Sequence, residues 1–294
     1  MASKEEKPYI PSKEAIAILD NFRLMDDNFM TLFFDQNFEA TELMLRIILN
    51  QKDITVKRIE VQKVEKNPTS NGRDVILDIF AQDSKGKNYD IEVQRADRGA
   101  ARKRARFLSG VLDSRMLNKN EDFSKMCDSY VIFITENDVM EKGLAMYHVN
   151  RHIEELENEP FDDGNHIIYV NGAYKNDSSD IGKLMHDFRC TSSKDMFYDV
   201  LKDGMHHFKE TEGGKAMTCK AIEAYGDEQR LEGREEGREE GKLEEKIATA
   251  KEMIADNMSV EKIEKYTGLS KEKINELSQV KKLKKITKQI ERKN

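Results

Sequence analysis

Residues 72–97 read GRDVILDIFAQDSKGKNYDIEVQRAD, and this stretch decides the fold. Residues 74–82 are almost continuously apolar, which is typical of a strand buried on both faces. The segment DSKGKN contains a glycine and fits a hairpin turn. The next segment, YDIEVQ, alternates strictly, so Asp90, Glu92 and Gln94 lie on one face of the partner strand. The stretch therefore predicts a β-hairpin with one polar face.

The segments around this hairpin predict a mixed α/β domain. Residues 36–50 have the apolar spacing of a helix, and residues 54–64 are rich in β-branched side chains, as strands are. After the hairpin, residues 98–118 read as an arginine-rich helix. Apolar segments at 129–135 and 166–171 read as further buried strands. The expected order is helix, three strands, helix, strand.

Two carboxylates of the hairpin are candidates for a metal site. Asp78 lies in the middle of the apolar strand, where a carboxylate is costly unless it is paired or bound to a cation. A tight hairpin brings Asp78 beside Glu92, and two adjacent carboxylates repel each other unless a cation or a proton lies between them. Oxygen ligands suit Mg²⁺. On spacing alone the alternative is favoured, in which Asp78 is a hydrogen-bonded strand residue and Glu92 an edge charge.

Basic side chains follow the hairpin directly and predict a contact with DNA. Phosphate contacts from such residues position a duplex without reading its sequence. The alternative is a solvated helix face paired with nearby acidic residues. The DNA interpretation is favoured because the charges adjoin the predicted metal site. The basic residues are Arg95, Arg98, Arg102, Lys103, Arg104 and Arg106, of which Arg102 and Arg106 share a helix face.

Composition limits the kind of protein this can be. The chain has 294 residues with 36% charged and 38% hydrophobic side chains, which predicts a packed region plus a solvent-rich extension. The net charge of −7 excludes a uniformly basic nucleic-acid binder. No apolar run is long enough for a membrane span, and no secretory signal is visible, so we expect a cytoplasmic protein.

The cysteines and histidines predict no zinc site. Cys127, Cys190 and Cys219 are widely spaced and form no CxxC pair, which disfavours a disulfide framework and a cysteine-rich zinc site. We expect three reduced thiols. His148 and His152 have the spacing of one helix face, but no third ligand clusters with them in the sequence, which again disfavours zinc.

The C-terminal third predicts an extension in two parts. Residues 226–246 carry glycine at every fourth position from Gly233, which indicates a connector or a weakly self-associating helix that would make the chain a homo-oligomer. Residues 247–294 read as a helix-turn-helix pair, with Lys271 and Lys273 towards DNA, or as a hairpin that only packs or dimerises. Its tail, KKLKKITKQIERKN, is strongly basic. The remainder, residues 1–225, would be the main domain.

The hairpin stretch resembles the PD-(D/E)XK nuclease family transposases, also called Rpn-type recombination-promoting nucleases. The segments FRLMDDNFMTLFF, ELMLRIILN, RKRARFLSGVLDS, YVIFITENDV and HIIYVNGAY occur in the family's order, and the resemblance covers roughly residues 20–245. It implies a restriction-endonuclease-like core, a mixed sheet flanked by helices, with an all-α C-terminal extension. It also implies a DNA endonuclease that hydrolyses phosphodiester bonds with Mg²⁺ or Mn²⁺.

The resemblance assigns roles residue by residue. Asp78 matches the metal-binding aspartate, Glu92 the acidic member of (D/E)XK, and the carbonyl of Val93 a third metal ligand. Glu42 matches an accessory acidic residue. Gln94 stands where the family pattern has lysine, so it can orient a water molecule but cannot stabilise an anion as lysine would. Leu77, not proline, precedes Asp78. The alternative is therefore a catalytically inactive DNA-binding or assembly protein derived from a nuclease.

Overall fold

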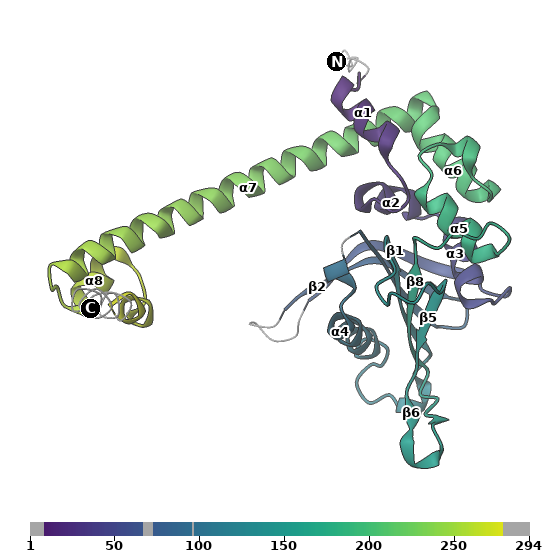
Figure 1. The fold of residues 1–294 in the computed structure, drawn as a ribbon, viewed down its shortest axis with the longest axis horizontal. Helices are drawn as coiled ribbons and strands as arrows, with labels where there is room; N and C mark the ends of the chain where they lie inside the picture. The colour runs from purple at the N-terminus through teal and green to yellow at the C-terminus, as the bar shows by residue number, and fades with distance from the viewer. Residues whose placement is uncertain (1–8, 67–72, 96, 279–294) are drawn as a thin grey trace, which may run out of the picture. The chain divides into compact units, whose positions relative to one another are not determined.

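The computed structural model describes residues 9–66, 73–95 and 97–278 (Figure 1). The chain divides into two compact units, residues 1–223 and 224–294. The predicted connector at 226–246 lies within one long helix, α7 (Glu212–Ala255), which begins in the first unit. Within the described residues, no helix is long and apolar enough to cross a membrane.

A six-stranded mixed sheet forms the centre of the first unit. Its order is β1-β2-β3-β4-β8-β5, with β1 (Val56–Glu65), β2 (Val75–Asp83), β3 (Asn88–Gln94), β4 (Ser129–Thr135), β8 (Asn165–Asn171) and β5 (Met146–Val149). The first three strands are antiparallel, as the hairpin pattern predicts. The strands β3, β4 and β8 are parallel, so β4 needs a crossover from β3, which α4 (Arg102–Asp113) supplies.

Helices cover both faces of the sheet, as Figure 1 shows. On one face Ile79, Ile91 and Ile132 join a large core with helices from the N-terminal segment and from residues 180–210. On the other face α4 buries Leu108 and Leu112 against apolar side chains of the strands. The helices of the larger layer are α1 (Lys13–Asn21), α2 (Asp27–Phe34), α3 (Phe38–Leu49), α5 (Asp180–Arg189) and α6 (Asp199–Glu210).

The predicted mixed α/β fold is confirmed, and the predicted elements are found with small shifts at their ends. The helix predicted at 36–50 is α3, which begins where the Asn37 side chain accepts from the Ala40 N–H (3.2 Å) and ends at Asn50 in the left-handed conformation (φ 51°). The described short elements that the sequence did not predict are β5 (Met146–Val149), β6 (His152–Ile153), β7 (Glu159–Pro160), η2 (Phe123–Lys125), η3 (Glu154–Leu156) and η4 (Ser193–Asp195), and the predicted helix at 98–118 begins as the short helix η1 (Asp97–Ala100).

His148 and His152 do not share a helix face. His148 lies in β5 and His152 in β6, and both are exposed. The helical spacing failed here because this segment is drawn into strand pairing, β5 with β8 and β6 with β7.

The second unit holds a small helical core. The end of α7, α8 (Val260–Thr267) and a helix over residues 271–278 bury Ala250, Ile263 and Ile274 together. Gly268 turns the chain between the two short helices with φ 67°, which favours glycine. The order expected for a helix-turn-helix pair is therefore found. The basic tail at 281–294 lies outside the described residues.

Candidate active site

The site begins where β2 and β3 separate. Their regular pairing ends at Ile79 and Ile91, so the next residues along are Asp78 and Glu92. Each of these carboxylates accepts a hydrogen bond from the other strand's backbone: Glu92 Oε1 from the Asp78 N–H (3.4 Å), and Asp78 Oδ2 from the Val93 N–H (3.2 Å). The two carboxylates therefore meet in the opening between the strands, as the hairpin pattern predicts.

Gln94 joins the same site. Its Nε2 donates to Asp78 Oδ2 and to Glu92 Oε2, each at 3.4 Å. Gly99, in η1, passes so close to the Gln94 amide that a Cβ at this position would collide with it. The backbone of residue 99 thus holds the amide against both carboxylates. An uncharged amide between two carboxylates leaves their repulsion largely uncompensated.

Arg104 supplies the positive charge that position 94 lacks. Its guanidinium pairs with Glu92 Oε2 and also donates to the carbonyl of Gly99 (3.1 Å). Arg104 lies in the first turn of α4 beside Arg102 and Lys103. Cations are unfavourable at a helix N-terminus, where the macrodipole is positive. A helix that begins with three of them creates a strongly positive edge beside the carboxylates.

The carboxylates of the site hold protons more tightly than usual. Burial and, to a lesser extent, the charges of Glu92 and Asp27 raise the pKa of Asp78 to about 7, against the opposing effects of the Val93 N–H and Arg104. Burial also raises the pKa of Glu92, against the opposing effect of Arg104. The common cause is negative charge gathered in a place with little water, and a divalent cation would relieve it.

Asp90 is a member of this site to which the sequence assigned no role. It is fully buried on the same strand face as Glu92. Among the residues that the structure describes, neither Asp90 oxygen has a hydrogen-bond partner. Burial raises the pKa of Asp90 well above its usual range, and the nearby charges of Glu92 and Asp78 raise it too. Asp90 and Glu92 are neighbours on this face, but no hydrogen bond joins their carboxyl groups. The strict alternation of YDIEVQ was the signal that could have found it.

The donor set fits a hard divalent cation. Asp78 and Glu92 offer carboxylate oxygens in one opening, and Asp90 adds two buried oxygens without a hydrogen-bond partner on the same strand face as Glu92. Mg²⁺ and Mn²⁺ take such oxygen ligands. Val93 lies between Glu92 and Gln94, with its N–H on Asp78 and its side chain in the core.

The structure does not bring Glu42 to this site. Its carboxylate pairs with Arg46 (2.7 Å) and accepts from the Val56 N–H (2.9 Å), so it ties α3 to the start of β1. The acidic residue that acts on Asp78 from the helical layer is Asp27, the first residue of α2. The Asp27 residue is exposed, but neighbouring groups keep water from part of its carboxyl, and this raises the pKa of Asp27. The charge of Arg95 lowers that pKa and so offsets part of the effect.

The predicted DNA-contact residues divide into several groups. Arg102 and Arg106 are exposed on α4, as expected, together with Lys103. Arg95 is exposed but pairs with Asp26 (3.1 Å) and Glu136 (3.4 Å), which also bind Arg23. The Arg98 side chain lies outside the described part of the structure. In the second unit Lys271 pairs with Glu264 (3.7 Å) and Lys273 with Glu276 (3.0 Å).

A basic groove runs along α4 beside the carboxylates. One hollow is lined by Gly99 and Arg104, which also contact the site, and by Arg73, Lys103 and Phe107. A second hollow is also lined by Arg73, Lys103 and Phe107, and its further basic residues are Arg106, Arg115 and Lys66. The two hollows share residues, and the charged side chains that line them are mostly positive, with Asp74 and Glu65 as the acidic members; Arg104, which pairs with Glu92, lines the first hollow.

One comparison with known proteins assigns the chain to a family. A protein-family model for PD-(D/E)XK nuclease family transposases matches residues 23–250, which is more than half of the chain. Searches of curated proteins and of solved structures found no match to the chain. The match spans the sheet, the helices that cover it apart from α1, and most of α7, and it stops before α8. The chain therefore belongs to the PD-(D/E)XK nuclease family transposases.

Proposed function

We propose that the protein is a divalent-metal-dependent endonuclease that hydrolyses phosphodiester bonds in DNA. The observation that supports this most is the strand opening in which Asp78, Glu92 and Gln94 meet. Membership of a nuclease family supports phosphodiester chemistry and a nucleic-acid partner. The raised pKa values of Asp78 and Glu92 support a site that binds a cation.

Each side chain of the opening has a role in this proposal. Asp78, Glu92 and the Val93 carbonyl hold Mg²⁺ or Mn²⁺, and Asp27 is the accessory acidic residue in place of Glu42. When bound, such an ion lowers the pKa of a water molecule and offsets negative charge on the phosphate. Gln94 orients the attacking water through its amide. Arg104 stabilises the anion, as lysine at position 94 would.

The proposed path for DNA is the basic groove along α4. Arg102, Lys103 and Arg106 reach solvent and would contact phosphates, which hold the backbone beside the carboxylates. The helix pair of the second unit, with Lys271 and Lys273, would increase the affinity for DNA and take no part in the cleavage reaction. The glycine-spaced part of α7 would support a homo-oligomer, since an added Cβ would meet nothing within 4 Å at Gly233, Gly237 or Gly241.

Cleavage of supercoiled plasmid with Mg²⁺ or with EDTA tests this proposal. The parent protein should nick plasmid only with metal, and Asp78→Asn and Glu92→Gln should not. Asp162→Asn, an exposed carboxylate of the same unit, is the matched control and should cleave like the parent. Metal-independent cleavage, or full activity in both site variants, would refute the proposed site.

A second candidate is a DNA-binding protein without catalysis. It is favoured by the pair between Arg104 and Glu92, because the guanidinium occupies the carboxylate oxygen that a metal would take. Titration calorimetry with Mg²⁺ separates the two candidates. The enzyme binds Mg²⁺ and loses that binding in Asp78→Asn, whereas the non-catalytic protein binds DNA equally with and without the ion.

A further inference from the structure

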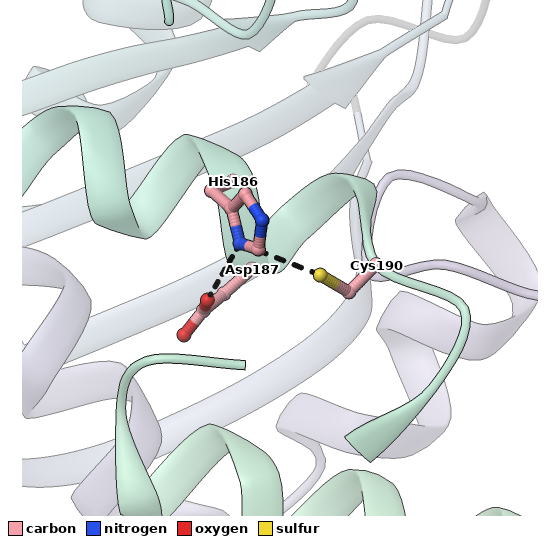
Figure 2. A group of neighbouring side chains, drawn as sticks. All are labelled: His186, Asp187 and Cys190. Atoms are coloured by element: carbon pink, nitrogen blue, oxygen red, sulfur yellow. Dashed lines mark hydrogen bonds and ion pairs between the residues drawn. The ribbon is translucent and has the colours of Figure 1, made fainter. Parts of the chain in front are cut away.

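Three metal-ligand side chains converge at the end of α5, in the larger helical layer. Figure 2 shows His186, Asp187 and Cys190 with their polar atoms directed at one another. His186 Nδ1 lies 3.3 Å from Asp187 Oδ1 and 3.5 Å from Cys190 Sγ, and one ligand atom of each residue lies within 4.8 Å of the other two. The sequence shows this group only as HDFRC, in which histidine and cysteine are one helical turn apart.

Hydrogen bonds also link these groups. The Cys190 thiol can donate to His186 Nδ1 (3.5 Å) or to the Asp195 carbonyl (3.8 Å). What points to a cation is therefore the convergence of nitrogen, oxygen and sulfur ligand atoms, and not an unsatisfied hydrogen bond.

The two distances from His186 Nδ1 match those of a tetrahedral metal site. Zinc binds nitrogen at about 2.0–2.1 Å, oxygen at about 2.0–2.2 Å and sulfur at about 2.3 Å. At tetrahedral angles these bond lengths require roughly 3.4 Å between nitrogen and oxygen and roughly 3.5–3.6 Å between nitrogen and sulfur. The observed 3.3 and 3.5 Å are close to both values.

The surrounding structure holds the three ligands in place. Asp187 is buried, and its two oxygens accept from the N–H groups of Phe197 (2.8 Å) and Tyr198 (2.9 Å). The His186 ring packs edge-on against Phe197, with ring centroids 4.7 Å apart. Partners of this kind orient metal ligands in proteins. His186 and Cys190 are half-buried and border a hollow with Lys175, Asp177 and Arg189, so a fourth position is open.

We infer that His186, Asp187 and Cys190 form a binding site for Zn²⁺ or a similar borderline-soft transition-metal ion. Nitrogen, sulfur and a single carboxylate suit zinc and do not suit Mg²⁺, so this site is chemically distinct from the strand opening. The fourth position would hold water or an external ligand. The bound ion would fasten the end of α5 to the turn at 196–198, and the inference does not depend on the proposed nuclease function.

Cobalt(II) titration of the full-length protein tests the site directly. Chelator-stripped, reduced protein should develop a thiolate charge-transfer band in the near ultraviolet when Co²⁺ is added, and Zn²⁺ should abolish this band. Cys190→Ser should lose the band, and His186→Gln should weaken binding by more than the roughly 10–100-fold that a lost outer-shell partner costs. Cys219→Ser and Asp78→Asn are controls that should keep the band.

Two outcomes would overturn the inference. One is a parent protein without a thiolate band at saturating Co²⁺, and the other is a band of equal intensity in Cys190→Ser. Should Cys190→Ser not fold, alkylation of the parent protein decides the question. Bound Zn²⁺ should slow iodoacetamide labelling of Cys190 but not of Cys127, and equal labelling rates with and without Zn²⁺ would count against the site.

Discussion

Replacement of Asp78 by Asn should stabilise the metal-free protein while it removes divalent-cation binding. Asn retains an oxygen that can accept from the Val93 N–H but loses the charge that burial and Glu92 oppose. The pKa of Asp78 is raised from 3.8 to about 7. Since a difference of one in pKa corresponds to about 1.4 kcal/mol, the charge costs at most about 4 kcal/mol of folding free energy. Because Glu92 shares this repulsion, we expect a gain of about 1 kcal/mol or more.

The sign of the pH dependence follows from the direction of the pKa change. The folded-state pKa of Asp78 lies above the unfolded-state value, so the ionised carboxylate costs nothing at low pH. The cost grows as the pH rises from about 4 to about 7 and is then constant. Urea unfolding in EDTA at pH 5 and pH 8 measures this cost. The unfolding free energy of Asp78→Asn should exceed that of the parent by more at pH 8 than at pH 5. Each 1 kcal/mol should raise Tm by roughly 2–4 °C.

Added Mg²⁺ should reverse part of this difference. An ion that binds only the folded parent raises its unfolding free energy, and the variant without the charge should gain little. Asp162→Asn serves as the matched control and should follow the parent at both pH values, with and without Mg²⁺. The reasoning fails if Asp78→Asn is no more stable than the parent at pH 8 without metal, or if Mg²⁺ stabilises both equally.

Three further predictions concern the surroundings of the site. Arg104→Gln should lower plasmid cleavage roughly 10–100-fold. It should also move Mg²⁺ binding to higher pH, because Arg104 lowers the pKa of Glu92 and without it Glu92 would ionise only at a higher pH. An unchanged pH profile of Mg²⁺ binding in calorimetry would contradict this. Asp90→Asn should gain unfolding free energy over the parent as the pH rises, because the folded-state pKa of Asp90 is raised; urea unfolding checks it, and a gain only at low pH would be the wrong sign. Deletion of residues 258–294 should make the salt dependence of DNA binding shallower by nearly one for each lost phosphate contact, with metal-dependent cleavage retained at high enzyme concentration; an equal slope would exclude this segment as a DNA contact.

Local sequence patterns were sufficient to predict five of the six strands of the sheet and to place Asp78 and Glu92 on adjacent strands. The apolar run of 74–82 and the alternation of 89–94 specify two strands, and a short turn forces them to pair, so Asp78 and Glu92 had to meet. The helix pair of the second unit was predictable for the same reason, since Gly268 ends α8 and the Ser270 side chain accepts from the Lys273 N–H at the start of the next helix (3.3 Å). Such signals depend on neighbours along the chain.

Only the tertiary structure decided which distant residues complete the site. Glu42 and Asp27 are both acidic residues of N-terminal helices, and only the packing of those helices on the sheet directs Asp27 towards Asp78 and Glu42 towards Val56. In the same way, the crossover from β3 to β4 places α4 so that Arg104, not another arginine of that helix, reaches Glu92. Helical or strand periodicity gives the face on which a side chain lies. The partner across that face depends on how separate elements pack, which local spacing does not encode.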